Sequence, residues 1–388
     1  MKNNYIGVWA VFEEDWEEGI EKAFRRYQKA GIQHVMYAGI AHAYPVNPSF
    51  YKNTRIDPMV QIDYEKNVGD VFGKKKHLLE ADFNGIKRLA AGYGLSLEFD
   101  ITPGVSEAIV KEYPDTAVAD VEGNRSPHWL CPSNPDVKAY FYGRTEDILR
   151  NNAGIKEVEL DVVSIDFYDP QVVPDWVSPE LYPLRQLAIG NCFCPHCIKR
   201  ALQAGLNVQM IKNEISAINK EAKTLTYGSF KNYSDAYRGL FDIVRFILKH
   251  PKLIDWLNFR VSLVSDFVSG YYRMVKNINR DILVSNDLVA PSFSWTLGQM
   301  YHLQKNFTDI TKMMLYHKTI GAYEVKPLRR IAKAIPEIQE DELLRQYYRL
   351  KGFSGPDTFD GLCKEGIGVE NVYYEVKKAR QEVGPSQR

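Results

Sequence analysis

Short strand-like segments alternate with long amphipathic helical segments along most of this 388-residue chain. This alternation is typical of a parallel β-sheet whose strands are joined by helical crossovers. Helical periodicity covers Glu14–Ala30, His77–Ala91 and Asp136–Asn151 and is clearest over Leu253–Ile278. Six segments read as strands: Tyr5–Phe12, His34–Ile40, Leu95–Ile101, Val158–Tyr168, Ile282–Leu288 and Asp309–Tyr316. We therefore expect an α/β fold, a (β/α)8 TIM-type barrel with long inserted loops.

The C-terminal part of the sequence breaks this alternation. No seventh or eighth strand is recognisable, and the remaining periodic segments are helical: Pro327–Ile335, Asp341–Leu350 and Val369–Gln381. The sequence therefore predicts a barrel at 1–320, with insertions at 41–75 and 169–235, and a mainly helical segment at 321–388. Such a barrel is incomplete at its last strands or is completed by another chain, since an open sheet edge would otherwise be exposed.

Charge and hydropathy exclude several classes of partner. The chain has 49 Lys plus Arg against 49 Asp plus Glu, so no overall basic field attracts nucleic acid or anionic lipid. No stretch approaches about 20 uninterrupted apolar residues, and acidic residues near the start do not fit a secretory signal. We expect a cytoplasmic protein that binds neither nucleic acid nor membrane.

A cluster of cysteines follows the fourth predicted strand. The segment NCFCPHC places Cys192, Cys194 and Cys197 within six residues, close enough for three thiolates to converge on one ion. A structural zinc site needs four ligands in a tetrahedron. Cys131 is the expected fourth ligand, because loops after neighbouring strands emerge at the same face of a barrel. His196 is the competing fourth ligand, and ordinary unligated thiols are the remaining alternative.

This cysteine pattern resembles a known family. The CxCxxC motif, together with CPSNPDV at Cys131–Val137, resembles the zinc site of glycoside hydrolase family 42, the β-galactosidase-type barrels, and of related uncharacterised glycosyl hydrolase barrels. The resemblance implies a (β/α)8-type barrel whose carboxylates cleave a glycosidic bond. It also implies a structural Zn²⁺ ion on Cys131, Cys192, Cys194 and Cys197.

Acids that end a strand are the candidates for catalysis, because barrel chemistry takes place at the C-terminal ends of the strands. Asp166 in IDFYDP follows a nearly continuous apolar run, and Asp287 in VSNDL has a similar context. These two are the predicted pair of carboxylates for glycoside hydrolysis. Glu98 and Asp100, on the third predicted strand, are expected to contact substrate instead.

The sequence also departs from family 42. That family carries its acid/base Glu, preceded by Asn, at the fourth strand and its nucleophile Glu near the seventh. Here Ile165 precedes Asp166, and no seventh strand is recognisable. The IDFYDP pattern more closely resembles fucosidase-like barrels, in which a strand-four Asp is the nucleophile, so family-42 activity is not transferred.

Aromatic and hydrogen-bonding side chains near the ends of the predicted strands favour a carbohydrate ligand, since sugars bind to aromatic faces and polar groups. Arg260 could pair with a catalytic acid or form a helix-surface ion pair. For Trp9, packing is at least as good an explanation as substrate binding. The other predicted substrate-binding residues of this group are His42, Tyr44, His128, Trp129, Tyr168, Tyr316 and His317.

Three functions are compatible with these features. The leading one is a glycoside hydrolase acting on a small sugar or oligosaccharide, with a structural zinc site. The second is a non-catalytic carbohydrate-binding or assembly subunit with a degenerate barrel. A zinc-dependent hydrolase is disfavoured, because four Cys ligands leave no open position for water. A homo-oligomer, or a partner chain that completes the barrel, is compatible with each.

Overall fold

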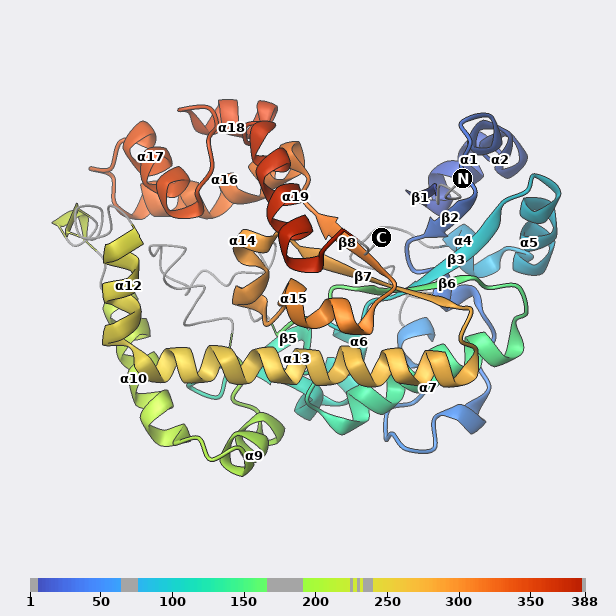
Figure 1. Cartoon of the computed structure of the whole chain (residues 1–388), viewed down its shortest axis with the longest axis horizontal. Coiled ribbons are helices and arrows are strands. Elements are labelled where there is room, and N and C mark those ends of the chain that lie inside the picture. The colour runs from blue at the N-terminus through green and yellow to red at the C-terminus, as the bar shows by residue number, and fades with distance from the viewer. Residues whose placement is uncertain are drawn as a thin grey trace.

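The computed structural model describes residues 6–63, 76–165, 191–223, 226–228, 231–232 and 240–385. Six parallel strands form the main sheet, in the order β1-β2-β3-β6-β7-β8 (Figure 1). Each crossover therefore adds the next strand on the same side, as in a barrel. The strands are β1 (Gly7–Ala10), β2 (His34–Tyr37), β3 (Ser96–Ile101), β6 (Glu157–Asp161), β7 (Leu283–Val289) and β8 (Ile310–Met314).

Contacts across the sheet show that it is curled. Trp9 on β1 donates a hydrogen bond from Nε1 to Glu159 Oε1 on β6 at 2.8 Å, although β2 and β3 lie between these strands. Lys312 on β8 reaches the same carboxylate from the other side. Three strand spacings of a flat sheet would separate β1 from β6 by about 14 Å. The sheet of the described residues is therefore a half-barrel, consistent with an incomplete TIM-type barrel.

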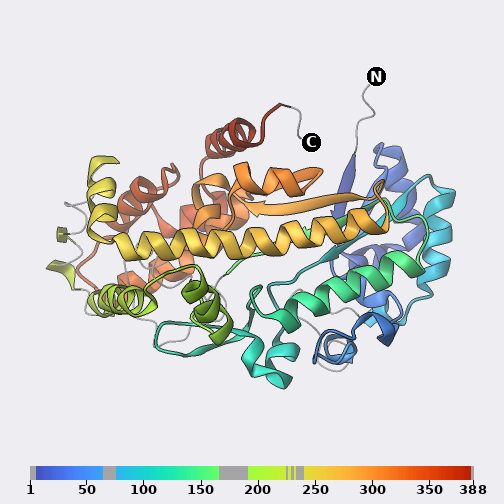
Figure 2. The same ribbon diagram turned by 60° about the horizontal axis from the view of Figure 1, so that its bottom comes forward.

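Helices pack along the sheet at the positions that the hydrophobic periodicity predicts. The longest, α13 (Pro251–Ile278), buries residues three and four apart and lies beside α7 (Pro135–Asn151) (Figure 2). Among the described residues, the other α-helices before β7 are α1 (Phe12–Glu18), α2 (Ile20–Lys29), α4 (Lys76–Glu80), α5 (Phe83–Gly92), α6 (Glu107–Glu112), α9 (Pro195–Gln203), α10 (Val208–Lys223) and α12 (Leu240–Lys249).

Two predicted helices are each divided in the structure. The helix expected over Glu14–Ala30 is α1 followed by α2, because Gly19 between them adopts φ 98°, which is unfavourable for a residue with a side chain. The helix expected over His77–Ala91 is α4 followed by α5, which begins where the Asp82 side chain accepts from Gly85 N. Amphipathic spacing continues through both breaks and so concealed them.

The loop predicted after the third strand contains a hairpin that the sequence analysis missed. Strands β4 (Ala117–Ala119) and β5 (Arg125–Leu130) pair antiparallel beside α6. Pro and Gly lie close to the short apolar runs of this segment, so the sequence pattern did not indicate strands there. The hairpin is relevant to the cysteine cluster because Cys131 follows β5 directly.

Helices account for most of the described chain after β8. Helices α16 (His317–Ala334), α17 (Glu340–Lys351) and α18 (Phe359–Glu365) share a hydrophobic cluster of their own. Helix α19 (Glu370–Val383) contacts α14 (Pro291–Ser294), the helix after β7, through Glu375, which accepts from Ser292 N and Oγ. In the described residues, no helix has the length and apolar character needed to span a bilayer. Helix α15 (Tyr301–Gln304) lies between α14 and β8 along the chain.

Candidate functional site

An acidic cluster lies on the concave face of the half-barrel. Along β6, Glu157, Glu159 and Asp161 alternate with the buried Val158 and Leu160. Alternate residues of a strand project from the same face, so the three acids share one face. The contacts of Glu159 with the side chains of the two edge strands identify it as the concave one.

Strand register brings further charged groups to the same place. Asp161 on β6 pairs with Asp287 on β7, which in turn pairs with Lys312 on β8. Paired residues of parallel neighbours project to the same side of a sheet. Glu159, Asp161, Asp287 and Lys312 therefore form one cluster toward the C-terminal end of the sheet, where barrel enzymes carry out their chemistry. We refer to these four residues as the acidic cluster.

Lys312 neutralises the innermost part of this cluster. Its Nζ contacts Glu159 Oε2 and lies 3.0 Å from Glu157 Oε1. Burial opposes the charged amine, but Glu159 and Glu157 together raise the pKa of Lys312 above its ordinary value. Because Glu159 is fully buried, this ammonium group and the Trp9 indole N–H offset the cost of its desolvation.

The surroundings of Asp287 favour the protonated form of its carboxyl group. Burial raises the pKa of Asp287 well above its usual range, and the neighbouring charges of Glu159 and Asp161 raise it further. A hydrogen bond with Glu159 also raises this pKa, as expected when one carboxyl group donates to another. The Oδ1 atom of Asp287 is buried and has no hydrogen-bond partner among the described residues. Asp287 is therefore a buried acid with a raised pKa and one oxygen to which no described residue donates a hydrogen bond.

Asp161 differs from Asp287 in exposure and in pKa. It is half-buried at the end of β6, and it accepts a hydrogen bond from Thr102 Oγ1 at 3.1 Å. Burial, and then the charge of Glu159, raise the pKa of Asp161 to about 6. Asp161 is thus ionised at neutral pH. The next residue, Val162, has φ 50°, a conformation that costs a β-branched residue about 1–3 kcal/mol and is found at functional sites.

The predicted catalytic pair is only partly described by the structure. Asp287 lies in the acidic cluster, whereas Asp166 and the predicted sugar contact Tyr168 lie outside the described residues. The strand expected to continue to Tyr168 ends at Asp161, so Asp161, not Asp166, is the acid at the end of the fourth parallel strand. Sequence reasoning missed Glu159, Asp161 and Lys312, although the alternation E-V-E-L-D over 157–161 indicated an acidic strand face.

Two other predicted acids are held by hydrogen bonds within the sheet. Glu98 is fully buried and accepts from Ser96 Oγ at 2.6 Å and from Glu157 N at 2.9 Å. Burial would raise the pKa of Glu98, but hydrogen bonds from His34 and Ser96 hold it below its ordinary value. Asp100 accepts from Gly39 N at 3.0 Å. In these positions both carboxylates fix loops and strands.

The remaining predicted sugar contacts occupy varied positions. Tyr44 is buried in ring contact with Phe83 and Phe99 in the core, and Arg260 is buried on α13. The hydroxyl of Tyr316 lies close enough to the acidic cluster for Asp287, Asp161 and Glu159, after burial, to raise its pKa. The others lie on separate elements: His42 in the 3-10 helix Ile40–Ala43, His128 and Trp129 on β5, and His317 at the start of α16.

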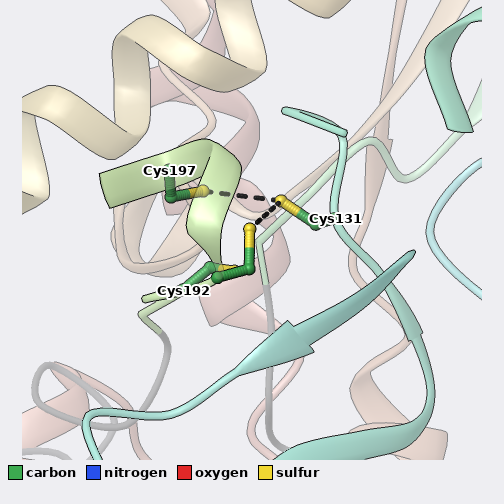
Figure 3. Close-up of side chains that lie close together, drawn as sticks. Cys131, Cys192 and Cys197 are labelled. Carbon is green, nitrogen blue, oxygen red and sulfur yellow. Dashed lines mark hydrogen bonds between the residues drawn. The ribbon is translucent and has the colours of Figure 1, made fainter. Parts of the chain in front are cut away.

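The cysteine cluster forms as the spacing indicated. The ligand atoms of Cys131, Cys192, Cys194 and Cys197 lie within 4.8 Å of one another, and all four residues are buried. The sulfur of Cys131 is 3.5 Å from that of Cys197 and 3.6 Å from that of Cys194 (Figure 3). A tetrahedron with Zn–S bonds of about 2.3 Å has edges of about 3.8 Å. The cluster could therefore bind a metal ion such as zinc.

Local structure holds the four sulfurs in place. Cys131 follows β5, and its backbone N–H donates to Thr116 O at 2.8 Å. On the other side, Cys194 is the N-cap of α9, and Phe193 N donates to Ala119 O at 2.7 Å. A metal at this point would therefore join the β4–β5 hairpin to α9.

Comparison with known proteins identifies solved structures of similar fold but no matching family model or curated sequence. The glycoside hydrolase domain of PgaB (BpsB) from Bordetella bronchiseptica is 15% identical, with a TM-score of 0.47 over 99% of this chain and 92% of that one. The β-galactosidase of Halorubrum lacusprofundi is 12% identical, with a TM-score of 0.44 over 82% of this chain and 41% of that one.

A third neighbour is the β-galactosidase of Bacillus circulans sp. alkalophilus, 14% identical, with a TM-score of 0.43 over 98% of this chain and 55% of that one. The chain thus spans about half or less of the length of these two β-galactosidases. The neighbours are glycoside hydrolases, as the cysteine motif led us to expect. At such identities and scores, no residue role passes from them to this chain.

Proposed function

We propose that this protein is a glycoside hydrolase whose catalytic carboxyl groups are Asp161 and Asp287. The observation that supports this most strongly is that the two acids lie opposite each other on β6 and β7 in different surroundings, which raise the pKa of Asp161 to about 6 and that of Asp287 well above its usual range. Glycoside hydrolysis requires one ionised and one protonated carboxyl group. Two acids in one cluster, with pKa values separated by their surroundings, meet that requirement.

The roles follow from the protonation states. Asp287 donates its proton to the glycosidic oxygen as that bond breaks, and Asp161, ionised at neutral pH, attacks the anomeric carbon or activates water. The resemblance of IDFYDP to fucosidase-like barrels implied Asp166 as the nucleophile; we propose Asp161 for this role because β6 ends at Asp161. Glu159 lies beside both groups and is contacted by Lys312.

The predicted contacts outside the acidic cluster complete the proposal. Asp166, predicted from sequence as a catalytic carboxylate, and Tyr168, predicted as a sugar contact, lie outside the described residues, and we keep Asp166 as the alternative partner of Asp287. Tyr316 is one of the aromatic residues predicted from sequence to bind sugar, and it is 60% exposed. Burial, and then the carboxyl groups of the acidic cluster, raise the pKa of its hydroxyl. Its ring is available to a sugar on the solvent side.

The metal in this proposal is a structural Zn²⁺ ion. Cys131, Cys192, Cys194 and Cys197 would hold it, and four thiolates leave no coordination position open for water. The ion therefore supplies cross-linking and no hydrolytic chemistry. By joining the β4–β5 hairpin to α9, it would brace the loops that follow β3 and β6.

Hydrolysis of aryl glycosides tests the proposal. We expect the purified protein to release 4-nitrophenol from at least one of the α- and β-linked 4-nitrophenyl glycosides of galactose, glucose, fucose and N-acetylglucosamine. On the corresponding methyl glycoside, whose poor leaving oxygen must be protonated as it departs, the D287N variant should lose at least about 10²-fold of the wild-type rate. The matched control is D281N, an exposed aspartate before the start of β7. Sugar binding without turnover would instead support a non-catalytic carbohydrate-binding subunit.

A further inference from the structure

Trp9 has a large apolar ring that is only partly buried, whereas tryptophan side chains are mostly buried in folded proteins. It lies on β1, an edge strand of the described sheet, and 43% of its surface is accessible. Its indole N–H is nevertheless fixed by Glu159 at 2.8 Å. One edge of the ring is therefore anchored in the acidic cluster, while much of the remaining ring faces solvent.

The anchor places this ring close to the carboxyl groups proposed to catalyse hydrolysis. Glu159 and Asp161 are two residues apart on the same face of β6, which corresponds to about 6.6 Å along the strand. Glu159 is itself held by Lys312 and, at 3.4 Å, by Ser285 Oγ. The indole is thus held in one orientation, so little conformational entropy would be lost when a ligand contacts it.

We propose that Trp9 is the stacking platform for a pyranose ring of the substrate, next to the bond that Asp161 and Asp287 cleave. This inference rests on the proposed function and adds to it the substrate contact. A pyranose carries hydroxyl groups at its rim and C–H groups on its faces. The indole face would cover such a C–H face, while the neighbouring carboxyl groups interact with hydroxyls and with the glycosidic oxygen.

The test compares three protein variants, each with one tryptophan replaced, with the wild type. W9A removes the ring, W9F keeps a ring but removes the N–H that Glu159 accepts, and W16A is the matched control. Trp16 is 41% exposed but lies on α1, where it stacks on His77 at 5.4 Å. Calorimetric titration with methyl thioglycosides of galactose, glucose, fucose and N-acetylglucosamine gives Kd, and the aryl glycosides give KM and kcat.

If Trp9 is the stacking platform, we expect W9A to raise Kd and KM about tenfold and W9F to raise them about threefold. W16A should change neither constant. If Trp9 only positions Glu159, W9F and W9A will lower kcat equally and leave Kd unchanged, which would overturn the inference. Unchanged Kd and KM in W9A, or no thioglycoside binding to the wild type, would overturn it as well. If binding depends on Trp9 but no glycoside is hydrolysed, the platform stands and the hydrolase proposal fails.

Discussion

Replacement of Asp161 by asparagine is expected to lower kcat/KM for the most reactive aryl glycoside about 10³-fold or more. Asparagine has nearly the same shape, and its amide oxygen can still accept the hydrogen bond from Thr102 Oγ1. What the variant lacks is the negative charge that attacks the anomeric carbon or activates water, a contribution of this order in enzymes. Steady-state rates for D161N and wild type, at equal concentrations of folded protein, measure this effect.

The control for D161N is again D281N, whose aspartate is exposed at the opposite end of the sheet. We expect its rate to stay within twofold of wild type. Because D161N removes a half-buried charge held near Glu159, it should also not lower the thermal midpoint. A D161N enzyme that keeps more than one tenth of the wild-type rate would remove Asp161 from the mechanism.

Replacement of Cys131 by serine is expected to abolish metal binding and to lower Tm by about 10 °C or more. The serine hydroxyl is a poor zinc ligand, and the three remaining thiolates would be left buried without their compensating cation. Metal binding to a structural site contributes directly to the free energy of folding. Elemental analysis of protein purified under reducing conditions, with calorimetry on the same samples, measures both quantities.

Cys363 provides the matched control for this substitution, because it is an exposed cysteine on α18 outside the cluster. C363S should keep about one zinc ion per chain and an unchanged Tm. Wild-type protein without bound zinc, or C131S with the wild-type Tm, would contradict the structural zinc site.

The sequence predicted the features that depend on local periodicity and spacing. Each of the six parallel strands overlaps its predicted segment, although β6 ends at Asp161 and not at Tyr168, and α13 begins and ends within two residues of its predicted limits. The convergence of Cys131 with Cys192, Cys194 and Cys197 also followed, because adjacent crossovers emerge at one end of the sheet. These predictions needed no knowledge of how far the sheet curls.

The acidic cluster could not be recognised in the same way. The apolar letters after Asp161 appeared to continue the strand, and a positive φ at Val162 is not encoded by any residue preference of valine. The contacts of Trp9 and Lys312 with Glu159 depend on the curl, which brings together strands far apart in the sequence. Burial, which sets the pKa of Asp161 and Asp287, is likewise a property of the folded sheet.

The dependence of kcat/KM on pH tests the division of roles between Asp161 and Asp287 most directly. Because Asp161 must be ionised, the rate should be low in acid and rise with pH through about 6. The rate should fall again only at higher pH, because the pKa of Asp287 is raised and its proton is lost only there. This rise must be absent from the residual activity of D161N. A wild-type profile that is level from pH 4 to pH 8, or an identical rise in D161N, would contradict the mechanism.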